Sequence, residues 1–180
     1  MINLLLCGNK KVFDGALTQL ISITNKTKRD ITCYIFTMDV SRIKPDYVSI
    51  TDEQVEFLEQ VVKSKNINNK IVKIDVTDLY EEEFGHCKNE TAYCTPYTLL
   101  RLLADKVPQI PDKILYLDID MMAGDDISKL YDIDITEYEY AAVKEKYGSW
   151  IIRPDYINAG MLLLNMKKIN ETGLLLRARE

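Results

Sequence analysis

The fold of this chain is decided by the stretch Lys113-Ile114-Leu115-Tyr116-Leu117-Asp118-Ile119-Asp120. Its apolar, β-favouring residues predict a buried strand that ends in two carboxylates. Because ligands of open α/β sheets bind outside the carboxyl ends of the strands, we expect Asp118 and Asp120 at the mouth of a crevice. Side chains two positions apart on a strand project the same way, so the two acids should converge on one cation. Carboxylates suit Mg²⁺ or Mn²⁺ held jointly with substrate phosphates, which predicts a metal-bound diphosphate as ligand.

An arbitrary D-x-D sequence is more often a solvated turn than a metal site, because Asp readily accepts hydrogen bonds from its own backbone. The stretch Asp132-Ile133-Asp134 has the same spacing without a long apolar strand before it, and we interpret it as a surface turn. The first pair differs because it follows an apolar strand that begins just after Pro108 and Pro111. The context of the pair, and not its spacing, carries the prediction.

Composition limits the possible classes of protein. The chain has 180 residues, of which 47% are hydrophobic, enough for one domain with a substantial core. Its net charge of −5 argues against a general nucleic-acid-binding surface. Four cysteines form no C-x-x-C pair, and the single histidine, His86, completes no convincing zinc set, so free thiols in a reducing compartment are expected.

The amino-terminal apolar run is too short for a signal peptide or a membrane span. We therefore expect no transmembrane segment and a location in the cytoplasm or peripherally at the inner membrane face. The sequence does not indicate an oligomeric state.

Strands and helices alternate along the sequence, which predicts a mostly parallel sheet flanked by helices, of Rossmann-like α/β type. Expected strands are Ile2–Cys7, Ile31–Thr37, Ile71–Ile74, Tyr140–Val143 and Met161–Asn165, the last preceded by a turn at Asn158-Ala159-Gly160. Expected helices are Val12–Ile23, one opened by a capping box at Thr51, Thr95–Lys106 with Thr95 as N-cap, a single turn near 125–130, and Lys167–Arg179. Residues 75–89 are expected to be irregular with a solvated acidic face, and 147–156 to be a loop that covers the site and carries Trp150. No linker divides residues 1–180, so one domain is expected.

Arg101 lies inside the apolar run Leu99–Leu103 of the expected helix 95–106. A guanidinium in such a run must find an anionic partner or extend to water.

Taken together, the motifs TPYTLLRLL, DKILYLDIDMM, DISKLYDIDI and INAGMLLLNMKKI resemble glycosyltransferase family 8 of the GT-A fold over nearly the whole chain. The resemblance implies a retaining transferase that moves a hexose from UDP-glucose or UDP-galactose to a hydroxyl of a glycan or lipid-linked saccharide. It also implies Mn²⁺, or Mg²⁺, as cofactor. A cation supplies charge stabilisation to a departing diphosphate, which is what this chemistry requires.

The same resemblance assigns roles to residues. Asp118 and Asp120 would bind the metal, and Arg101 and Asn158 would act on the donor sugar as catalytic residues. Substrate contacts are further implied for Cys7, Gly8, Asn9, Leu117, Ile119, Ala159 and Gly160. The segment Cys7–Val12 departs from the family's Ala-Ser-Asp-x-x-Tyr, and Glu145 stands where the family more often has Asp, so nucleotide preference and a sugar contact at 145 stay open.

The family's later D-Q-D-x-x-N and H-x-x-G-x-x-K-P-W motifs have no match in the chain, which therefore resembles a carboxyl-terminally truncated domain. A non-catalytic nucleotide-sugar-binding fragment or a decayed transferase is the alternative interpretation. A phosphatase of the haloacid-dehalogenase type also places D-x-D after an apolar strand, but Met122 stands where that family usually has Thr or Val. A calcium loop of the EF-hand type fails because Ala123 takes the place of its glycine.

Overall fold

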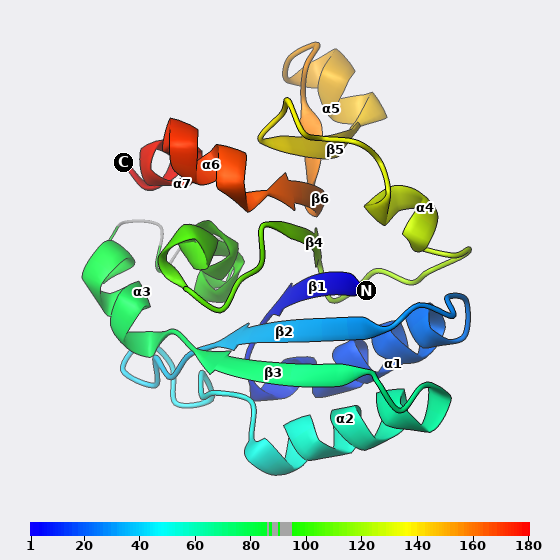
Figure 1. Cartoon of the computed structure of the whole chain (residues 1–180). Coiled ribbons are helices and arrows are strands. Elements are labelled where there is room, and N and C mark those ends of the chain that lie inside the picture. The colour runs from blue at the N-terminus through cyan, green and yellow to red at the C-terminus, as the bar shows by residue number, and fades with distance from the viewer. Residues whose placement is uncertain (86, 88–89, 91–94) are drawn as a thin grey trace.

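A central sheet organises the computed structural model, which describes residues 1–85, 87, 90 and 95–180 (Figure 1). Within these residues the sheet has six strands in the order β3-β2-β1-β4-β6-β5. The strands are β1 (Ile2–Cys7), β2 (Ile31–Thr37), β3 (Lys70–Asp75), β4 (Lys113–Leu117), β5 (Tyr140–Lys144) and β6 (Ile157–Asn165). All residues of β1 are buried, which fits its place at the centre of the sheet.

The sheet is parallel on one side and antiparallel on the other. Strand β1 pairs in parallel with both β2 and β4, and β2 pairs in parallel with β3. Strand β6 pairs antiparallel with β4 and with β5. The predicted mostly parallel α/β sheet is therefore confirmed. The chain leaves β1 on the β2 side and later returns on its other side as β4, which makes the carboxyl ends of β1 and β4 the topological switch point.

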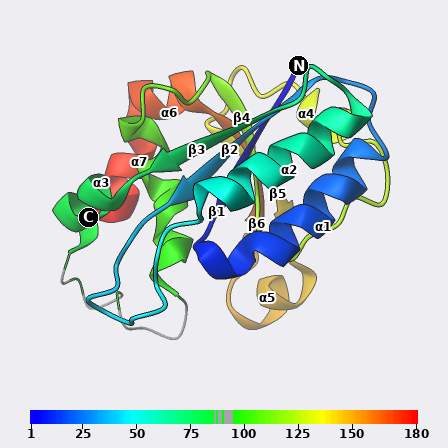
Figure 2. The same ribbon diagram turned by 90° about the horizontal axis from the view of Figure 1, so that it is seen from below.

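Helices cover both faces of the sheet, and each covered face has its own apolar core. Helices α1 (Phe13–Thr24) and α2 (Asp52–Lys65) lie side by side on one face (Figure 2). The other face is covered by α3 (Thr77–Phe84), the 3₁₀ helix η3 (Pro96–Lys106), α6 (Met166–Thr172) and α7 (Leu174–Arg179). Strand residues alternate between these cores: Leu115 and Leu117 face α1, whereas Ile114 and Tyr116 face η3.

The local signals at the helix starts explain where several elements begin. The predicted capping box is present, because the Thr51 hydroxyl accepts from the Gln54 N–H while the Gln54 side chain accepts from the Thr51 N–H. The 3₁₀ turn η1 (Lys10–Val12) precedes α1 and is capped by the Asn9 side chain. Thr95 occupies the N-cap position of η3 without a side-chain capping bond. The single turn expected near 125–130 is α4 (Ser128–Tyr131).

The prediction of an irregular, solvated segment at 75–89 was wrong for residues 77–84, because α3 forms there. Tyr80 and Phe84, one helical turn apart, are buried against η3 and anchor the helix. Two of its acids form ion pairs: Glu81 with Arg42, and Glu83 with Lys106 and Arg179. Glu82 alone of the three stays exposed. His86 and Cys94 lie outside the described residues.

Three other boundaries differ from expectation. Residues 147–156 do not form a plain loop, because α5 (Lys146–Ile151) forms with Glu145 as its N-cap. Asn158-Ala159-Gly160 belongs to β6 and is not a turn, because the pairing with β5 extends to Ile157 at the start of the strand and the Gly160 carbonyl accepts from the Asp118 N–H. The expected helix 167–179 is split by Gly173, whose φ of +67° interrupts α6 before α7.

No helix within the described part of the chain is long and apolar enough to cross a membrane.

Candidate functional site

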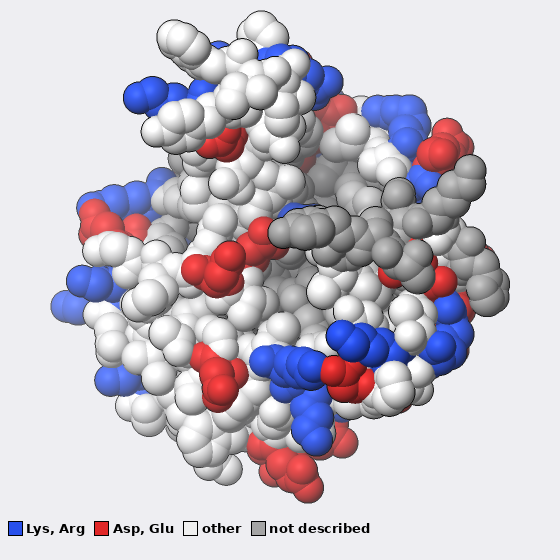
Figure 3. Space-filling model, turned by 180° about the vertical axis from the view of Figure 1, so that it is seen from behind, with Lys and Arg blue, Asp and Glu red and all other residues white. Residues whose placement is uncertain are grey.

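A cleft of about 740 Å³ opens at the carboxyl ends of β1 and β4. It lies at the switch point, where α/β sheets commonly bind ligands. Acidic side chains gather near the centre of this side of the molecule beside a hollow, and basic side chains lie below it (Figure 3). The residues that line the cleft are Cys7, Gly8, Asn9, Lys11, Val12, Gly15, Lys44, Tyr47, Thr95, Tyr97, Thr98, Arg101, Tyr116, Asp118, Ile119 and Asp120.

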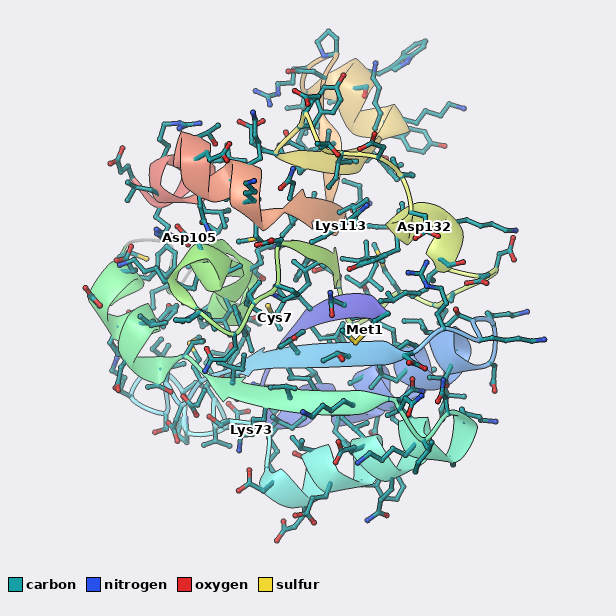
Figure 4. The ribbon with its side chains drawn as sticks, in the orientation of Figure 1. Met1, Cys7, Lys73, Asp105, Lys113 and Asp132 are labelled. Carbon is teal, nitrogen blue, oxygen red and sulfur yellow. The ribbon has the colours of Figure 1, made fainter. Side chains whose placement is uncertain are left out.

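The loop after β1 supplies Cys7, Gly8 and Asn9, as the sequence predicts. Cys7 lies at the carboxyl end of β1, opposite Met1 at the start of the chain (Figure 4). Burial raises the pKa of its thiol, so Cys7 is neutral near pH 7 and serves as an apolar wall. Asn9 is 5% exposed, and its side-chain oxygen accepts from the Lys11 N–H at 3.0 Å. Asn9 therefore shapes this loop from within.

Asp118 and Asp120 follow the end of β4 and both line the cleft. The strand itself stops at Leu117, so the predicted strand alternation does not extend to the two acids, which lie in the loop that follows. Asp118 is anchored through its backbone, whose N–H donates to the Gly160 carbonyl at 2.7 Å. Asp120 is exposed, so its carboxylate is accessible from solvent.

The Asp118 carboxylate is held by two neighbours from the same face of the sheet. The Tyr116 hydroxyl donates to Asp118 Oδ1, and the Arg101 guanidinium lies 3.5 Å from the same oxygen. Burial raises the pKa of Tyr116, which keeps the phenol protonated as a hydrogen-bond donor. The other carboxylate oxygen, Oδ2, lies against Gly160, where an added Cβ would approach it to 2.6 Å. Both oxygens of Asp118 are thus fixed in position.

Arg101 makes two hydrogen bonds at the junction of η3, β4 and β6. Its Nε donates to the Thr98 carbonyl at 2.9 Å, and its Nη1 donates to the Ala159 carbonyl at 2.5 Å. The guanidinium also lies over the Tyr116 ring, 4.7 Å from the centroid. Of the two alternatives expected for Arg101, an anionic partner or water, the structure shows the anionic partner, Asp118.

The remaining predicted site residues are Leu117 and Ile119, next to the two acids, and three residues of β6. Ile119 lines the cleft, whereas Leu117 is buried in the core on the α1 side. Asn158 and Ala159 are exposed at the start of β6, and the Asn158 side chain accepts from the Gly160 N–H at 2.8 Å. These β6 residues adjoin the cleft through Arg101 and Asp118.

One face of α1 supports the D-x-D loop, which sequence reasoning missed. Gly15 packs so closely that an added Cβ would lie 2.5 Å from Ile119 Cγ2. One turn later the buried Gln19 donates to the Asp118 carbonyl at 2.8 Å. One turn further, the Ser22 hydroxyl accepts from the Ala123 N–H at 2.9 Å. The spacing of these small and polar residues in an otherwise apolar helix was the available signal.

The opposite wall of the cleft comes from the segment after β2, which the sequence analysis also did not select. Tyr47 packs edge-to-face on Tyr97 with ring centroids 5.5 Å apart, and Lys44 lies 5.4 Å from the Tyr47 centroid. Lys11 forms an ion pair with Asp46 at this rim. The cleft therefore joins acids, bases and aromatic faces, a combination suited to a nucleotide with its phosphates.

The carboxylates of the cleft suit a hard divalent cation whose remaining coordination positions are filled by water and phosphate oxygens. Asp118 and Asp120 offer carboxylate oxygens in one cleft, as Mg²⁺ and Mn²⁺ prefer. Among the described residues no group of three or more His, Cys, Asp or Glu side chains forms a complete metal cage.

Comparison with known proteins gives a consistent result. The family model described as Glycosyl transferase family 8 matches residues 3–180. Glycosyltransferase GlyF of Streptococcus pneumoniae is 26% identical over 143 residues, which cover 79% of this chain and 31% of GlyF. Glycosyltransferase GlyA of the same organism is 30% identical over 130 residues, covering 70% of this chain and 18% of GlyA. The chain thus spans about a third or less of the length of these two relatives.

Solved structures show the same fold. The galactosyltransferase LgtC, in complex with donor and acceptor sugar analogs, aligns with a TM-score of 0.72 at 21% identity, covering 94% of this chain and 60% of LgtC. The glycosyltransferase GlyE of Streptococcus pneumoniae aligns with a TM-score of 0.67 at 20% identity, covering 98% of this chain and 37% of GlyE.

Proposed function

This chain belongs to glycosyl transferase family 8, and on that premise we propose that it transfers a hexose from UDP-glucose or UDP-galactose to an acceptor hydroxyl with retention of configuration. The observation that carries the proposal is the cleft at the switch point, into which β4 delivers Asp118 and Asp120 beside Arg101. We propose that residues 1–180 form its nucleotide-sugar-binding domain. The acceptor would be a glycan or a lipid-linked saccharide, and the reaction would take place in the cytoplasm.

The diphosphate of the donor would lie next to the two acids. Asp118 and Asp120 would hold Mn²⁺, or Mg²⁺, which when bound neutralises negative charge on the departing UDP. Tyr116 and Arg101 restrain Asp118 before any ligand arrives, so little reorganisation is needed on binding. The uracil and ribose would lie toward Gly8, Asn9 and the Tyr47 wall.

The hexose would lie on the β6 side of the acids. The Arg101 side chain is 13% exposed and lines the cleft. Its guanidinium is already held by the Ala159 carbonyl. It would donate to the sugar or to the phosphate next to it, and the exposed amide of Asn158 would hydrogen-bond to sugar hydroxyls. Cys7 and Ile119 would exclude water from the reacting bond.

In the reaction the bond between the anomeric carbon and the phosphate oxygen breaks, and a bond to the acceptor oxygen forms. The sugar gains positive charge as UDP departs, so stabilising the leaving phosphate lowers the barrier. We propose that the acceptor proton passes to the leaving phosphate oxygen, which requires no separate general base.

The test is turnover with purified chain, UDP-glucose or UDP-galactose and Mn²⁺, read as released UDP. Hydrolysis of the donor without acceptor serves as the basal signal. We expect turnover that is lost on chelation of the metal and in Asp120→Asn. Turnover in Asp120→Asn equal to that of the wild type would contradict the proposal.

A non-catalytic nucleotide-sugar-binding domain is a second candidate, because the described cleft residues supply only two acidic side chains. It predicts Mn²⁺-dependent UDP binding without turnover. The family match favours a transferase over the phosphatase alternative of the D-x-D motif, which release of phosphate from an aryl phosphate would test directly.

A further inference from the structure

The segment from Tyr140 to Tyr156, here called the β5–α5 lobe, carries a concentrated apolar surface. Of the fifteen exposed large hydrophobic residues in the described part of the chain, seven lie in this segment. The exposed fractions are 90% for Trp150, 82% for Ile151 and 62% for Ile152. The other four are Tyr140, Val143, Tyr147 and Tyr156. Isolated exposed apolar residues are ordinary, but a contiguous group marks an interaction surface.

Hydrogen bonds and side-chain packing within the lobe hold its exposed tip in a defined conformation. The Glu145 carboxylate accepts from the Gly148 N–H at the start of α5. The Glu145 N–H donates to the Tyr156 carbonyl at 3.0 Å and closes the loop. Tyr156 packs over the buried Gly148, where an added Cβ would approach its ring to 2.1 Å. The backbone is thus satisfied within the lobe, and Trp150, Ile151 and Ile152 are left at the end of α5.

The charge of the lobe differs in sign from that of the whole chain. Lys144, Lys146 and Arg153 stand against Glu145 and Asp155, which leaves one net positive charge in a chain of net charge −5. Arg153 pairs with Asp155, and Glu145 is turned inward onto Gly148. The two exposed lysines therefore flank an uncharged tip. Figure 3 shows this projecting part as mostly uncharged, with basic side chains at its sides and acidic ones at its base.

We propose that the β5–α5 lobe binds the surface of a lipid bilayer that contains anionic headgroups. Trp and Tyr rings with adjacent Ile side chains suit the boundary between headgroups and acyl chains, and lysines beside them attract anionic lipid. The lobe projects from the body of the molecule (Figure 1), so its tip can enter a planar surface without a complementary hollow. Two copies in contact through their lobes form the competing arrangement.

The position of the lobe also bears on the identity of the acceptor, an inference that rests on the proposed function. Val143 of β5 pairs with Asn158 of β6, and β6 meets the cleft through the contacts of Arg101 and Asp118 with Ala159 and Gly160. A bilayer held at the lobe would lie beside the sugar side of the cleft. That placement favours an acceptor saccharide carried on a lipid.

Trp150 is the only tryptophan of the chain, so its fluorescence reports directly on the lobe. The experiment titrates the purified chain with vesicles of phosphatidylcholine alone and of phosphatidylcholine mixed with phosphatidylglycerol. We expect a blue shift of emission and co-sedimentation with the mixed vesicles only, both weakened by salt. Changing Lys144 and Lys146 together to Gln should weaken partitioning about 30-fold, which is ~2 kcal/mol at about 1 kcal/mol per basic residue. Ile151→Ser with Ile152→Ser should weaken it as well.

Ile67→Ser is the matched control, because Ile67 is 77% exposed and lies just before β3, at the edge of the sheet opposite β5. It should leave partitioning unchanged. The proposal is overturned by emission that does not respond to mixed vesicles, by equal binding to neutral vesicles, or by a blue shift that follows protein concentration without lipid, which would indicate paired copies. A chain that binds UDP with Mn²⁺ but ignores vesicles overturns only this inference.

Discussion

The Arg101 guanidinium lies 3.5 Å from Asp118 Oδ1 and thereby links η3 to the loop after β4. The same guanidinium donates to the Ala159 carbonyl of β6. Arg101 therefore connects β6, where we propose that the sugar binds, to Asp118, which we propose as a metal ligand.

Replacing Arg101 tests that link. Arg101→Lys keeps the charge but loses the forked geometry that reaches Thr98, Ala159 and Asp118 together. We expect donor turnover to fall at least ~10-fold with a smaller change in UDP binding, since about 1.4 kcal/mol of transition-state stabilisation is one factor of ten. Steady-state kinetics and UDP titration measure the two effects. Equal loss of UDP binding and turnover would place Arg101 on the nucleotide instead of the sugar.

Tyr116→Phe removes the hydroxyl that donates to Asp118 while keeping the ring under Arg101. Because the pKa of Tyr116 is raised by burial, the wild-type phenol remains a donor throughout the neutral and mildly alkaline range. We expect Mn²⁺ to bind several-fold more weakly in the variant, with thermal stability changed by no more than ~1 kcal/mol. Unchanged Mn²⁺ affinity would show that the hydrogen bond does not position Asp118.

Gly15→Ala tests the support that α1 gives to the D-x-D loop. Alanine raises helix propensity by about 1 kcal/mol, but its Cβ would lie 2.5 Å from Ile119 Cγ2, so the loop must move. We expect donor turnover to fall more than stability does. Gly124→Ala is the control, because nothing lies within 4 Å of its added Cβ. Equal effects of the two substitutions on turnover would contradict the close-packing argument.

Acid stability should depend on Glu83. Lys106 first, and then Arg179, hold the pKa of the Glu83 carboxyl below its ordinary value near 4.5. A group whose folded pKa is depressed stabilises the protein above about pH 4.5, and this stability is lost as the pH falls through the folded pKa. Melting curves should show Glu83→Gln less stable than wild type at pH 7, with the gap closing in acid.

Exposed Glu82 on the same helix provides the comparison. Glu82→Gln should follow the wild type across the same pH range. A gap between Glu83→Gln and wild type that stays constant down to pH 3 would contradict the ion-pair explanation.

Strong periodic or capping signals made much of the fold predictable. Ile2–Cys7 and Ile31–Thr37 form strands with the predicted bounds, and Thr51 forms the predicted capping box. The sequence predicted an irregular segment in the region of α3 because its acids suggested exposure to solvent. In the structure Glu81 and Glu83 instead form ion pairs with Arg42, Lys106 and Arg179. Such pairing depends on tertiary contacts that no local pattern contains.

The site was predictable where one segment carried the signal. Asp118 and Asp120 were selected from the apolar strand before them and Arg101 from the family resemblance, and all three line one cleft. Lys44 and Tyr47 were not selected, because their segment has no motif and reaches the cleft only through the fold. Gln19 was hidden within an apolar helix, although its side chain holds the Asp118 carbonyl.

The central claim is that the acids after β4 hold a divalent cation together with the phosphates of a nucleotide. Its most direct test is titration of Mn²⁺ followed by electron paramagnetic resonance, with and without UDP, in wild type, Asp120→Asn and Asp134→Asn. Asp134 belongs to the second D-x-D stretch, which is exposed and outside the cleft, and so serves as the control. We predict that UDP tightens Mn²⁺ binding in wild type and in Asp134→Asn, and that Asp120→Asn abolishes this effect. Tight, UDP-dependent Mn²⁺ binding that survives in Asp120→Asn would contradict the account.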